Sequence, residues 1–281
     1  MIKRKFIPGS EWLYLKIYTG IKTADIILEE IIDPIIKYFQ EKKIISKWFF
    51  IRFHDPKPHV RLRFELKNQK NYNEILDHIN HAFFDHIESG EISNIVADTY
   101  NREIERYGKK NIEDAETLFH LNSELTMQCL HYDDEEKIMV SLFIIDQILN
   151  KVNLSVQEKM VWIKNSNEAF KKEFNADKKL NSQLDKKYRE FKPSFLDFIG
   201  SDEFRFERNS VISNIEQGNI ALHNIIYHYQ NQSFELSLLS FFQSIFHMNI
   251  NRLFTSNQRF FEMIIYDYLL RYYKSLDYLK I

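Results

Sequence analysis

Residues 47–67, KWFFIRFHDPKPHVRLRFELK, limit the possible folds of this chain more than any other stretch. In the second half, polar and apolar residues alternate as they do in a half-buried strand, with Val60, Leu62 and Phe64 on one face. The first half, residues 48–53, is an aromatic run, and the segment DPKP between the halves is typical of a turn. The stretch therefore predicts an antiparallel hairpin.

The polar face of the second predicted strand carries a basic row, His59, Arg61 and Arg63. Surface strands usually mix the signs of their charges, whereas here two guanidinium groups stand two residues apart. Each guanidinium is a rigid fork of donors that suits a carboxylate or a phosphate. The same spacing is compatible with a solvated strand face on which Glu65 is the ionic partner. The pattern leaves both an anion site and a solvated face open.

Composition narrows the class of protein and of partner. The 281 residues are 44% hydrophobic, enough for a large core in one domain or in two closely packed ones. A net charge of −2 gives no general reason to expect direct nucleic-acid binding, so any anion site is local. One cysteine, Cys129, and no signal peptide favour a cytoplasmic location without disulfides. We expect no membrane span, cofactor motif or metal site.

The order of predicted elements indicates an α+β fold. Strand, helix, two strands, helix and strand fill the first hundred residues, and the pattern after Gly108 is helical almost throughout. We predict an N-terminal antiparallel sheet with packed helices over residues 1–110 and a mostly helical region over residues 111–281, packed as one domain. Besides the hairpin, the expected strands are 12–18 and 92–107, and the expected helices are 24–43, 71–87, 111–132, 133–152, 155–174, 202–231, 233–254 and 258–278, with a new segment starting at Pro193.

A second polar stretch, DTYNREIERYG at residues 98–108, admits two interpretations. If it starts as a strand, Asp98, Tyr100 and Arg102 share a face, and Arg102 comes to lie next to the basic row of the hairpin. If it is a helical or irregular turn, its arginines and glutamates pair among themselves.

A third stretch, residues 240–254, is an apolar helix with a polar ridge. The ridge consists of Ser240, Gln243 or Ser244, His247 and Asn251, which line up at three- and four-residue steps. A helix that is apolar on nearly all sides is expected to be buried, and buried polar groups need partners. The ridge predicts either a polar cavity in which His247 exchanges protons near neutral pH, or a histidine satisfied within the core.

Together these stretches resemble the C-terminal, SpaB-type domain of class I lanthipeptide dehydratases. Four matches in the family's order cover most of the chain. They are FIPGSEWLYLKIY at 6–18, WFFIRF at 48–53 with PHVRLRF at 58–64, YNREIERYG at 100–108 and HMNINRL at 247–253.

The resemblance implies glutamate elimination. In that family a glutamylation domain first esterifies Ser or Thr of a precursor peptide with glutamate from glutamyl-tRNA. The elimination domain then removes the Cα proton and expels glutamate, leaving dehydroalanine or dehydrobutyrine. We expect a stand-alone version here, with the precursor peptide (leader and glutamylated core) and a separate glutamylation protein as partners. The oligomeric state stays open, a homodimer included.

By motif position, the resemblance implies a catalytic set. The family's essential arginines fall on Arg61, Arg63 and Arg102, and its essential histidine falls on His247. We expect Arg61 and Arg63 to bind the glutamyl carboxylates, and Arg102 the same anion or the enolate. His247 is the expected base. Tyr100, in the third of the matching segments, is predicted to bind substrate.

The C-terminal motif adds one expected contact and one departure. Asn251 is predicted to bind substrate. Asn249 stands where the family often has a second histidine, which favours an alternative, a pyridine-forming cyclase of the same fold from thiopeptide pathways. A further alternative is a non-catalytic partner whose arginines grip an acidic leader peptide.

Overall fold

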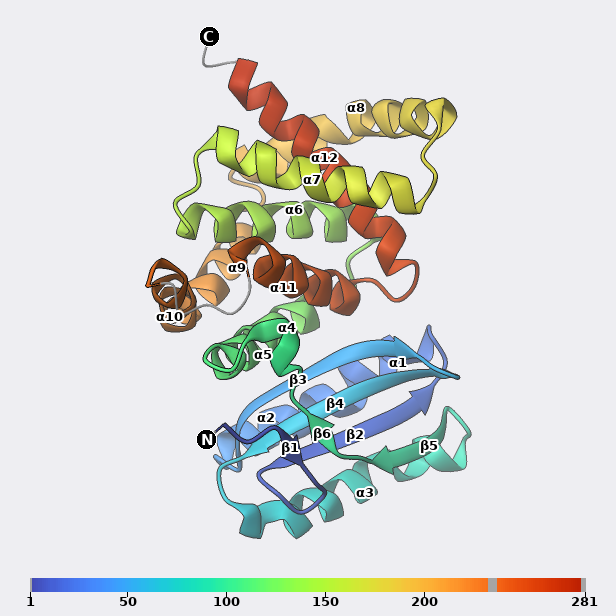
Figure 1. Cartoon of the computed structure of the whole chain (residues 1–281). Helices are drawn as coiled ribbons and strands as arrows, with labels where there is room; N and C mark the ends of the chain where they lie inside the picture. The colour runs from blue at the N-terminus through green and yellow to red at the C-terminus, as the bar shows by residue number, and fades with distance from the viewer. Residues whose placement is uncertain (1, 232–236, 279–281) are drawn as a thin grey trace. The chain divides into compact units, whose positions relative to one another are not determined.

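The computed structural model describes residues 2–231 and 237–278 (Figure 1). The chain divides into two compact units: unit 1 is Met1–Leu130 with His223–Ser256, and unit 2 is His131–Leu222 with Asn257–Ile281. This division differs from the boundary predicted near residue 110. The reason is that two helices from the helical region, α5 (Ile112–Gln128) and α11 (Leu238–Leu253), pack against strand β3 (Ile45–His54) of the sheet.

Unit 1 is built on a four-stranded antiparallel sheet in the order β3-β4-β2-β5, in which the predicted hairpin is the β3–β4 pair. A second, small sheet pairs the short strands β1 and β6. The α+β fold with an N-terminal antiparallel sheet is therefore confirmed. The strands besides β3 are β1 (Lys5–Phe6), β2 (Trp12–Thr19), β4 (Pro58–Leu66), β5 (Ile92–Ala97) and β6 (Tyr100–Asn101).

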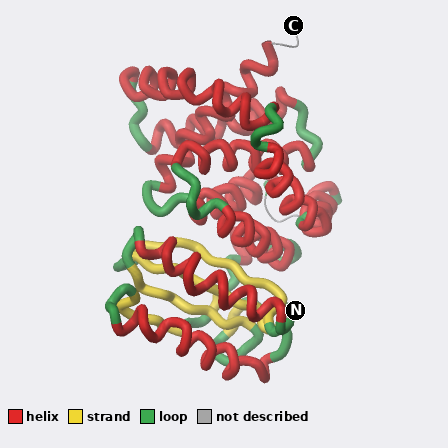
Figure 2. Tube along the Cα trace, turned by 180° about the vertical axis from the view of Figure 1, so that it is seen from behind, coloured by secondary structure: helices red, strands yellow, loops and turns green. Residues whose placement is uncertain are grey.

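One face of this sheet is covered by helices, as Figure 2 shows. The alternation along β2 and β4 turns Leu15, Leu62 and Phe64 into that face, where each is at most 2% exposed. Pro34 occupies the first turn of a new helix after a π-helical segment, as expected for a residue without an N–H. The covering elements are α1 (Thr23–Ile27), η1 (Leu28–Ile32), α2 (Asp33–Glu41) and α3 (Tyr72–Glu88), which follows the 3₁₀ turn η2 (Gln69–Asn71).

The free edge of β3 is capped by side chains. His120 of α5 places its Nδ1 3.1 Å from the Trp48 carbonyl oxygen, and the Phe50 N–H donates to the Ser123 hydroxyl at 3.3 Å. An uncapped edge strand pairs readily with another chain, and its unpaired N–H and C=O groups are costly to bury. α5 therefore belongs with the sheet although it lies in the region predicted as separate.

The predicted extended segment 92–107 is shorter than expected. β5 and β6 end by Asn101, and the chain then turns into α4 (Ile104–Tyr107), which closes at Gly108 with φ of 77°. Glycine adopts this left-handed conformation at little cost.

Unit 2 is helical over its described residues. The capping box predicted at Ser155 and Glu158 is present, whereas Pro193 lies inside α8 instead of starting a segment. The predicted helix 202–231 is two helices that meet at Gly218, and the predicted start at Ser233 lies outside the described residues. Over the described residues, each helix is too short or too polar to cross a membrane. The helices are α6 (Asp134–Lys151), α7 (Val156–Glu173), α8 (Lys178–Gly200), α9 (Arg205–Gln217) and α12 (Gln258–Tyr278), with α10 (Asn219–Gln230) shared between the units.

Candidate active site

Arg63 lies in a cage of aromatic rings on the sheet face opposite the helices. Antiparallel register places it directly between Tyr14 on β2 and Phe49 on β3. The guanidinium carbon is 4.3 Å from the centroid of the Tyr14 ring, 5.2 Å from that of Phe49 and 5.0 Å from that of Tyr100. The side chain is only 8% exposed. Three rings therefore fix the orientation of this guanidinium.

No carboxylate within the described part of the chain forms an ion pair with Arg63, and its Nε has no hydrogen-bond partner there. Burial lowers the pKa of the Arg63 guanidinium, while Tyr100 and Tyr14 act in the opposite direction. A buried charge without a counter-ion costs several kcal/mol, and each cation–π contact returns about 0.5–2 kcal/mol. The surroundings of Arg63 hold a cation in place without neutralising it. Such a group favours an incoming anion.

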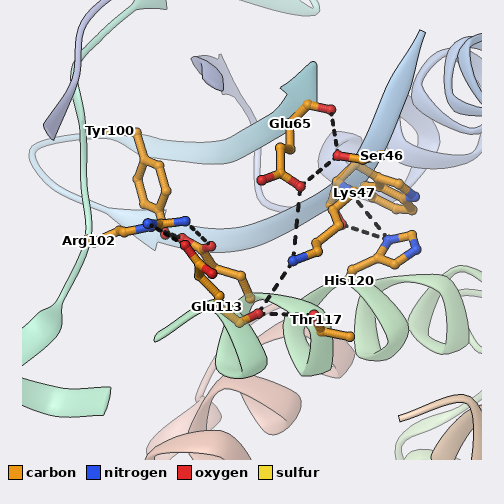
Figure 3. Close-up of polar contacts among 10 residues, drawn as sticks. Ser46, Lys47, Glu65, Tyr100, Arg102, Glu113, Thr117 and His120 are labelled. Carbon is orange, nitrogen blue, oxygen red and sulfur yellow. Dashed lines mark hydrogen bonds and ion pairs between the residues drawn. The ribbon is translucent and has the colours of Figure 1, made fainter. Parts of the chain in front are cut away.

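Glu65 is not the partner of the basic row. Its carboxylate accepts a hydrogen bond from the Ser46 hydroxyl at 2.6 Å and lies 4.0 Å from the Lys47 ammonium (Figure 3). The solvated strand face with Glu65 as the ionic partner is therefore not what the structure shows. Among the described residues, no side-chain carboxylate forms an ion pair with Arg61 or Arg63.

Arg61 is held through its Nε and through one face of its guanidinium. Its Nε donates to Nε2 of His59 at 3.1 Å, and its guanidinium carbon lies 3.4 Å from the centroid of the Phe53 ring. Within residues 2–231 and 237–278, nothing accepts a hydrogen bond from its two Nη nitrogens. These two groups form the fork that binds a carboxylate in a bidentate manner. Arg61 thus presents its donors beside the caged Arg63.

Arg102 is neutralised by the buried carboxylate of Glu116. Its Nε and Nη2 donate to the two oxygens of Glu116, both at 2.7 Å, and Glu116 is 0% exposed. Burial opposes the charge, but the bonds to Glu116 raise the pKa of Arg102. The Tyr100 hydroxyl donates to the same carboxylate at 2.7 Å. Arg102 therefore reaches Arg63 through Glu116 and the Tyr100 ring, and its direct contact with substrate stays a prediction.

Glu103 and Arg106 are further site candidates, which the sequence pattern did not indicate. Their side chains form an ion pair at 3.1 Å and are 59% and 47% exposed. The charge of Glu103 is among those that raise the pKa of Arg63, against the effect of burial. Both residues lie in the segment YNREIERYG, which contains two arginines. The two arginines differ in burial, since the Arg102 side chain is buried and the Arg106 side chain is accessible. The motif alone does not show which of the two is buried.

Asn251 binds the backbone of the sheet edge. The Arg52 N–H donates to its Oδ1 at 2.9 Å, and its Nδ2 donates to the Arg52 carbonyl at 3.0 Å. The next residue, Arg252, donates from Nε to the Phe50 carbonyl at 2.7 Å. The amide of Asn251 thus continues the ladder of β3, and its predicted contact with substrate is not tested by this geometry.

His247 is half-buried on α11, one turn before Asn251. The bonds from α11 to β3 therefore determine where this histidine stands relative to the sheet. Asn249 on the same helix is 2% exposed, and neither end of its amide has a hydrogen-bond partner among the described residues. Buried amides are normally paired, so the position of the missing second histidine is occupied by an unsatisfied polar group.

A comparison with protein families matches residues 12–273 to the family described as lantibiotic biosynthesis dehydratase, C-terminal part. The chain belongs to this family. Membership in the lantibiotic dehydratase C-terminal family confirms the resemblance drawn from the four motifs and places the chain among proteins of lantibiotic biosynthesis.

Two relatives of this chain are much longer proteins. The nisin biosynthesis protein NisB of Lactococcus lactis subsp. lactis is 26% identical over 284 residues, which cover 99% of this chain and 27% of NisB. The subtilin biosynthesis protein SpaB of Bacillus subtilis is 27% identical over 187 residues, which cover 63% of this chain and 18% of SpaB. The chain therefore spans a minor part of the length of either relative.

Solved structures show the shared fold of the lantibiotic dehydratase C-terminal family. The tRNA-dependent lantibiotic dehydratase MibB from Microbispora sp. 107891 matches with a TM-score of 0.72 and 18% identity, over 100% of this chain and 29% of MibB. TbtD, a pyridine synthase from thiomuracin biosynthesis, matches with a TM-score of 0.56 and 12% identity, over 95% of this chain and 100% of TbtD.

Proposed function

We propose that this protein eliminates glutamate from glutamylated Ser or Thr residues of a ribosomally made precursor peptide. The observation that carries the proposal is the pair Arg61 and Arg63, neighbours on one strand face without a described carboxylate partner. A glutamyl ester brings a side-chain carboxylate and, on leaving, generates a second one. Two guanidinium forks suit this leaving group better than a neutral substrate.

The reaction needs one proton transfer and one bond cleavage. A base removes the Cα proton of the esterified residue, and the electron pair of the C–H bond forms the Cα=Cβ double bond. The Cβ–O bond breaks, and its electron pair leaves with the carboxylate of glutamate. His247 is the proposed base, because an imidazole accepts a proton near neutral pH. The products are dehydroalanine or dehydrobutyrine, glutamate and a protonated base.

The arginines have different proposed tasks. Arg63 is held by three rings and binds the developing carboxylate, where preorganised charge lowers the barrier most. Arg61 binds the side-chain carboxylate through its free Nη groups. Arg102 positions Tyr100 through Glu116, and Tyr100 in turn forms one wall of the Arg63 cage. Arg106 is the accessible arginine of its motif and is proposed to flank the entering peptide.

The proposed partners follow from the reaction. An eliminating protein requires a substrate that another activity has already esterified. We therefore propose a glutamylation protein that uses glutamyl-tRNA, together with the precursor peptide, as partners of this chain. The tRNA contact would belong to that protein, in line with the net charge of −2 here.

Mass spectrometry of a chemically glutamylated, Ser-containing peptide tests the proposal. Wild-type protein is expected to release glutamate and leave dehydroalanine, and His247→Ala and Arg63→Met are each expected to abolish the release. Arg205→Met, on an arginine that is 72% exposed on α9, is the matched control and should leave the rate unchanged. If the wild type releases no glutamate, glutamate elimination is refuted for this peptide. A peptide with two dehydroalanines would then test the cyclase alternative, which Asn249 favours.

A further inference from the structure

We propose that His59 is a positioning residue for Arg61: it holds the Nε of that guanidinium and thereby presents both Nη nitrogens to the substrate anion. The inference rests on the proposed function of the arginine pair, but the link between the two side chains stands on its own geometry. The Nε of Arg61 lies 3.1 Å from Nε2 of His59 on the same strand.

The hydrogen bonds of His59 determine its protonation state. Its ring is 2% exposed, and its Nδ1 lies 2.9 Å from the carbonyl oxygen of Lys57. A carbonyl oxygen only accepts, so Nδ1 carries the hydrogen. The neutral ring then has its lone pair on Nε2, where the Arg61 N–H donates to it. This tautomer of neutral histidine satisfies both bonds, whereas the imidazolium has no lone pair left for Arg61.

Ring contacts fix the imidazole in place. The His59 ring centroid is 4.7 Å from that of Tyr18 on β2 and 5.5 Å from that of Phe53 on β3. Phe53 also lies under the guanidinium of Arg61, at 3.4 Å. His59 and Arg61 therefore pack on one ring and bind each other, so the direction of the guanidinium fork is set on two sides.

Burial and two neighbouring cations favour the neutral form of His59. Burial lowers the pKa of His59, and Arg61 on the same strand and Lys16 on β2 act in the same direction. Asp55, in the turn before β4, acts against them, as does the carbonyl of Lys57. Lys16 is itself paired with Asp98 at 2.5 Å, so its own charge is largely balanced. The link to Arg61 is therefore intact at neutral pH and breaks when acid protonates Nε2.

Arg61 needs this support more than Arg63 does. Three rings surround Arg63, whereas Arg61 makes a cation–π contact with one ring of the described residues, Phe53, which is 39% exposed. A guanidinium that is free to rotate loses side-chain entropy when it binds an anion, and a preorganised one avoids much of that loss. His59 thus supplies to Arg61 the rigidity that the cage supplies to Arg63.

NMR of protein labelled with ¹⁵N-histidine and ¹⁵N-arginine tests the link directly. The Arg61 Nε–H signal is identified by its loss in Arg61→Lys. We expect the wild-type His59 ring to be neutral with its hydrogen on Nδ1. On acidification, the Arg61 Nε–H signal should shift with the midpoint of His59, below the usual value of about 6.5. In His59→Phe the signal should move to the position of a solvated arginine, and in His59→Gln, whose amide oxygen replaces Nε2 as acceptor, it should stay near the wild-type position.

Kinetics with the glutamylated Ser peptide test the consequence. His59→Phe is expected to raise KM about tenfold with little change in kcat, because Arg61 would bind the same carboxylate in the substrate and in the transition state. His59→Gln should restore KM to within about threefold, as expected when the lost hydrogen bond and not packing is responsible. His54→Phe, on an exposed histidine of the same hairpin, is the matched control and should leave KM unchanged.

Three outcomes would overturn the inference. One is an Arg61 Nε–H signal that is identical in wild type and His59→Phe. Another is an Arg61 signal that does not follow His59 on acidification. The third is a KM in His59→Phe that equals that of wild type. A wild-type protein that bound the peptide but released no glutamate would refute the proposed function instead, and the NMR titration would still decide the link.

Discussion

Arg63 and Arg102 are both buried but differ in what surrounds them. Arg102 is 4% exposed and is bound by both oxygens of a buried glutamate. Arg63 is 8% exposed and is surrounded by aromatic rings. Removing the carboxylate from a buried ion pair is strongly destabilising, whereas a buried arginine without a carboxylate is itself costly to keep. We therefore expect opposite changes in the free energy of unfolding when Arg63 is replaced and when Arg102 loses its buried partner.

Replacement of Arg63 by Met is expected to leave the free energy of unfolding unchanged or to raise it by about 1 kcal/mol, because a buried, unpaired charge is replaced by apolar atoms of similar length. Burial also lowers the pKa of Arg63, which means that the folded protein disfavours this charge, in agreement with the expected gain in stability. Urea denaturation measures the change. A loss of more than about 2 kcal/mol would show that the cage stabilises the fold through this arginine.

Replacement of Glu116 by Gln is expected to lower the free energy of unfolding by about 3 kcal/mol, because it removes the buried counter-ion of the buried Arg102 charge and leaves only an exposed one. The matched control is Glu113→Gln. That carboxylate also lies near Arg102, at 3.3 Å, but it is 66% exposed, and its loss should cost less than about 1 kcal/mol. Equal effects of the two variants in urea denaturation would contradict this assignment.

The sequence was sufficient to place Arg61 and Arg63 side by side, because a period of two needs no knowledge of the partner strands. The partner of Arg102 was not predictable. Glu116 lies fourteen residues further on in a helix, and nothing in its local pattern marks it as buried. The role of Asn251 was equally hidden, since its partner is the backbone of a strand 199 residues away in sequence.

At the scale of elements, the free edge of β3 links the sheet to the helix that carries His247. Side chains from α5 and α11 reach the backbone at alternate residues of the strand, Trp48, Phe50 and Arg52. An edge strand capped in this way cannot pair with another chain, and α11 is held in register with the sheet. The hydrogen bonds from α11 to the β3 backbone therefore link the helix of His247 to the sheet that carries the basic row.

Replacement of Asn251 by Ala is expected to lower the hydrogen-exchange protection of the Arg52 amide by about tenfold or more, because loss of the acceptor leaves that N–H unsatisfied, at a cost of about 1–3 kcal/mol. Ser244→Ala is the matched control on the same helix, since the Ser244 hydroxyl donates to a carbonyl of its own helix at 3.0 Å. Unchanged protection at Arg52 in the Asn251 variant would refute the capping role.

Element boundaries were predicted best where local signals are strong. The capping box at Ser155 fixed the start of α7. Pro193 misled the prediction, because a proline within a helix costs about 3 kcal/mol and usually ends it. In α8 the buried Tyr188, Phe191, Phe195 and Phe198 lie on both sides of it, so packing outweighs that cost.

At the scale of the whole molecule, each compact unit is assembled from two separate stretches of chain. Unit 1 needs residues 223–256 to complete the edge of its sheet, although unit 2 intervenes in the sequence. This interleaving explains why a boundary at residue 110, placed where the local pattern changes from mixed to helical, does not separate the units. Local patterns report element type, whereas unit membership depends on long-range packing.

Two truncations follow from this arrangement. A chain that ends at Ser256 keeps every segment of unit 1, whereas a chain that ends at Leu222 loses α11. Hydrogen exchange is expected to show a protected Arg52 amide in the longer chain and an exchange-competent one in the shorter chain, because the acceptor of that N–H, Asn251 on α11, is missing there. Equal protection in both chains would show that α11 is dispensable for the sheet.

The most direct measurement compares the rate of elimination from a Ser peptide esterified with glutamate and from the same peptide esterified with glutamine. The wild type is expected to prefer the glutamyl ester by about 100-fold, since hydrogen bonds to a charged group contribute about 1.5–3 kcal/mol each. His247→Ala is expected to stop both reactions. Equal rates for the two esters with the wild-type protein would contradict the claim that the arginine pair recognises the leaving group by its charge.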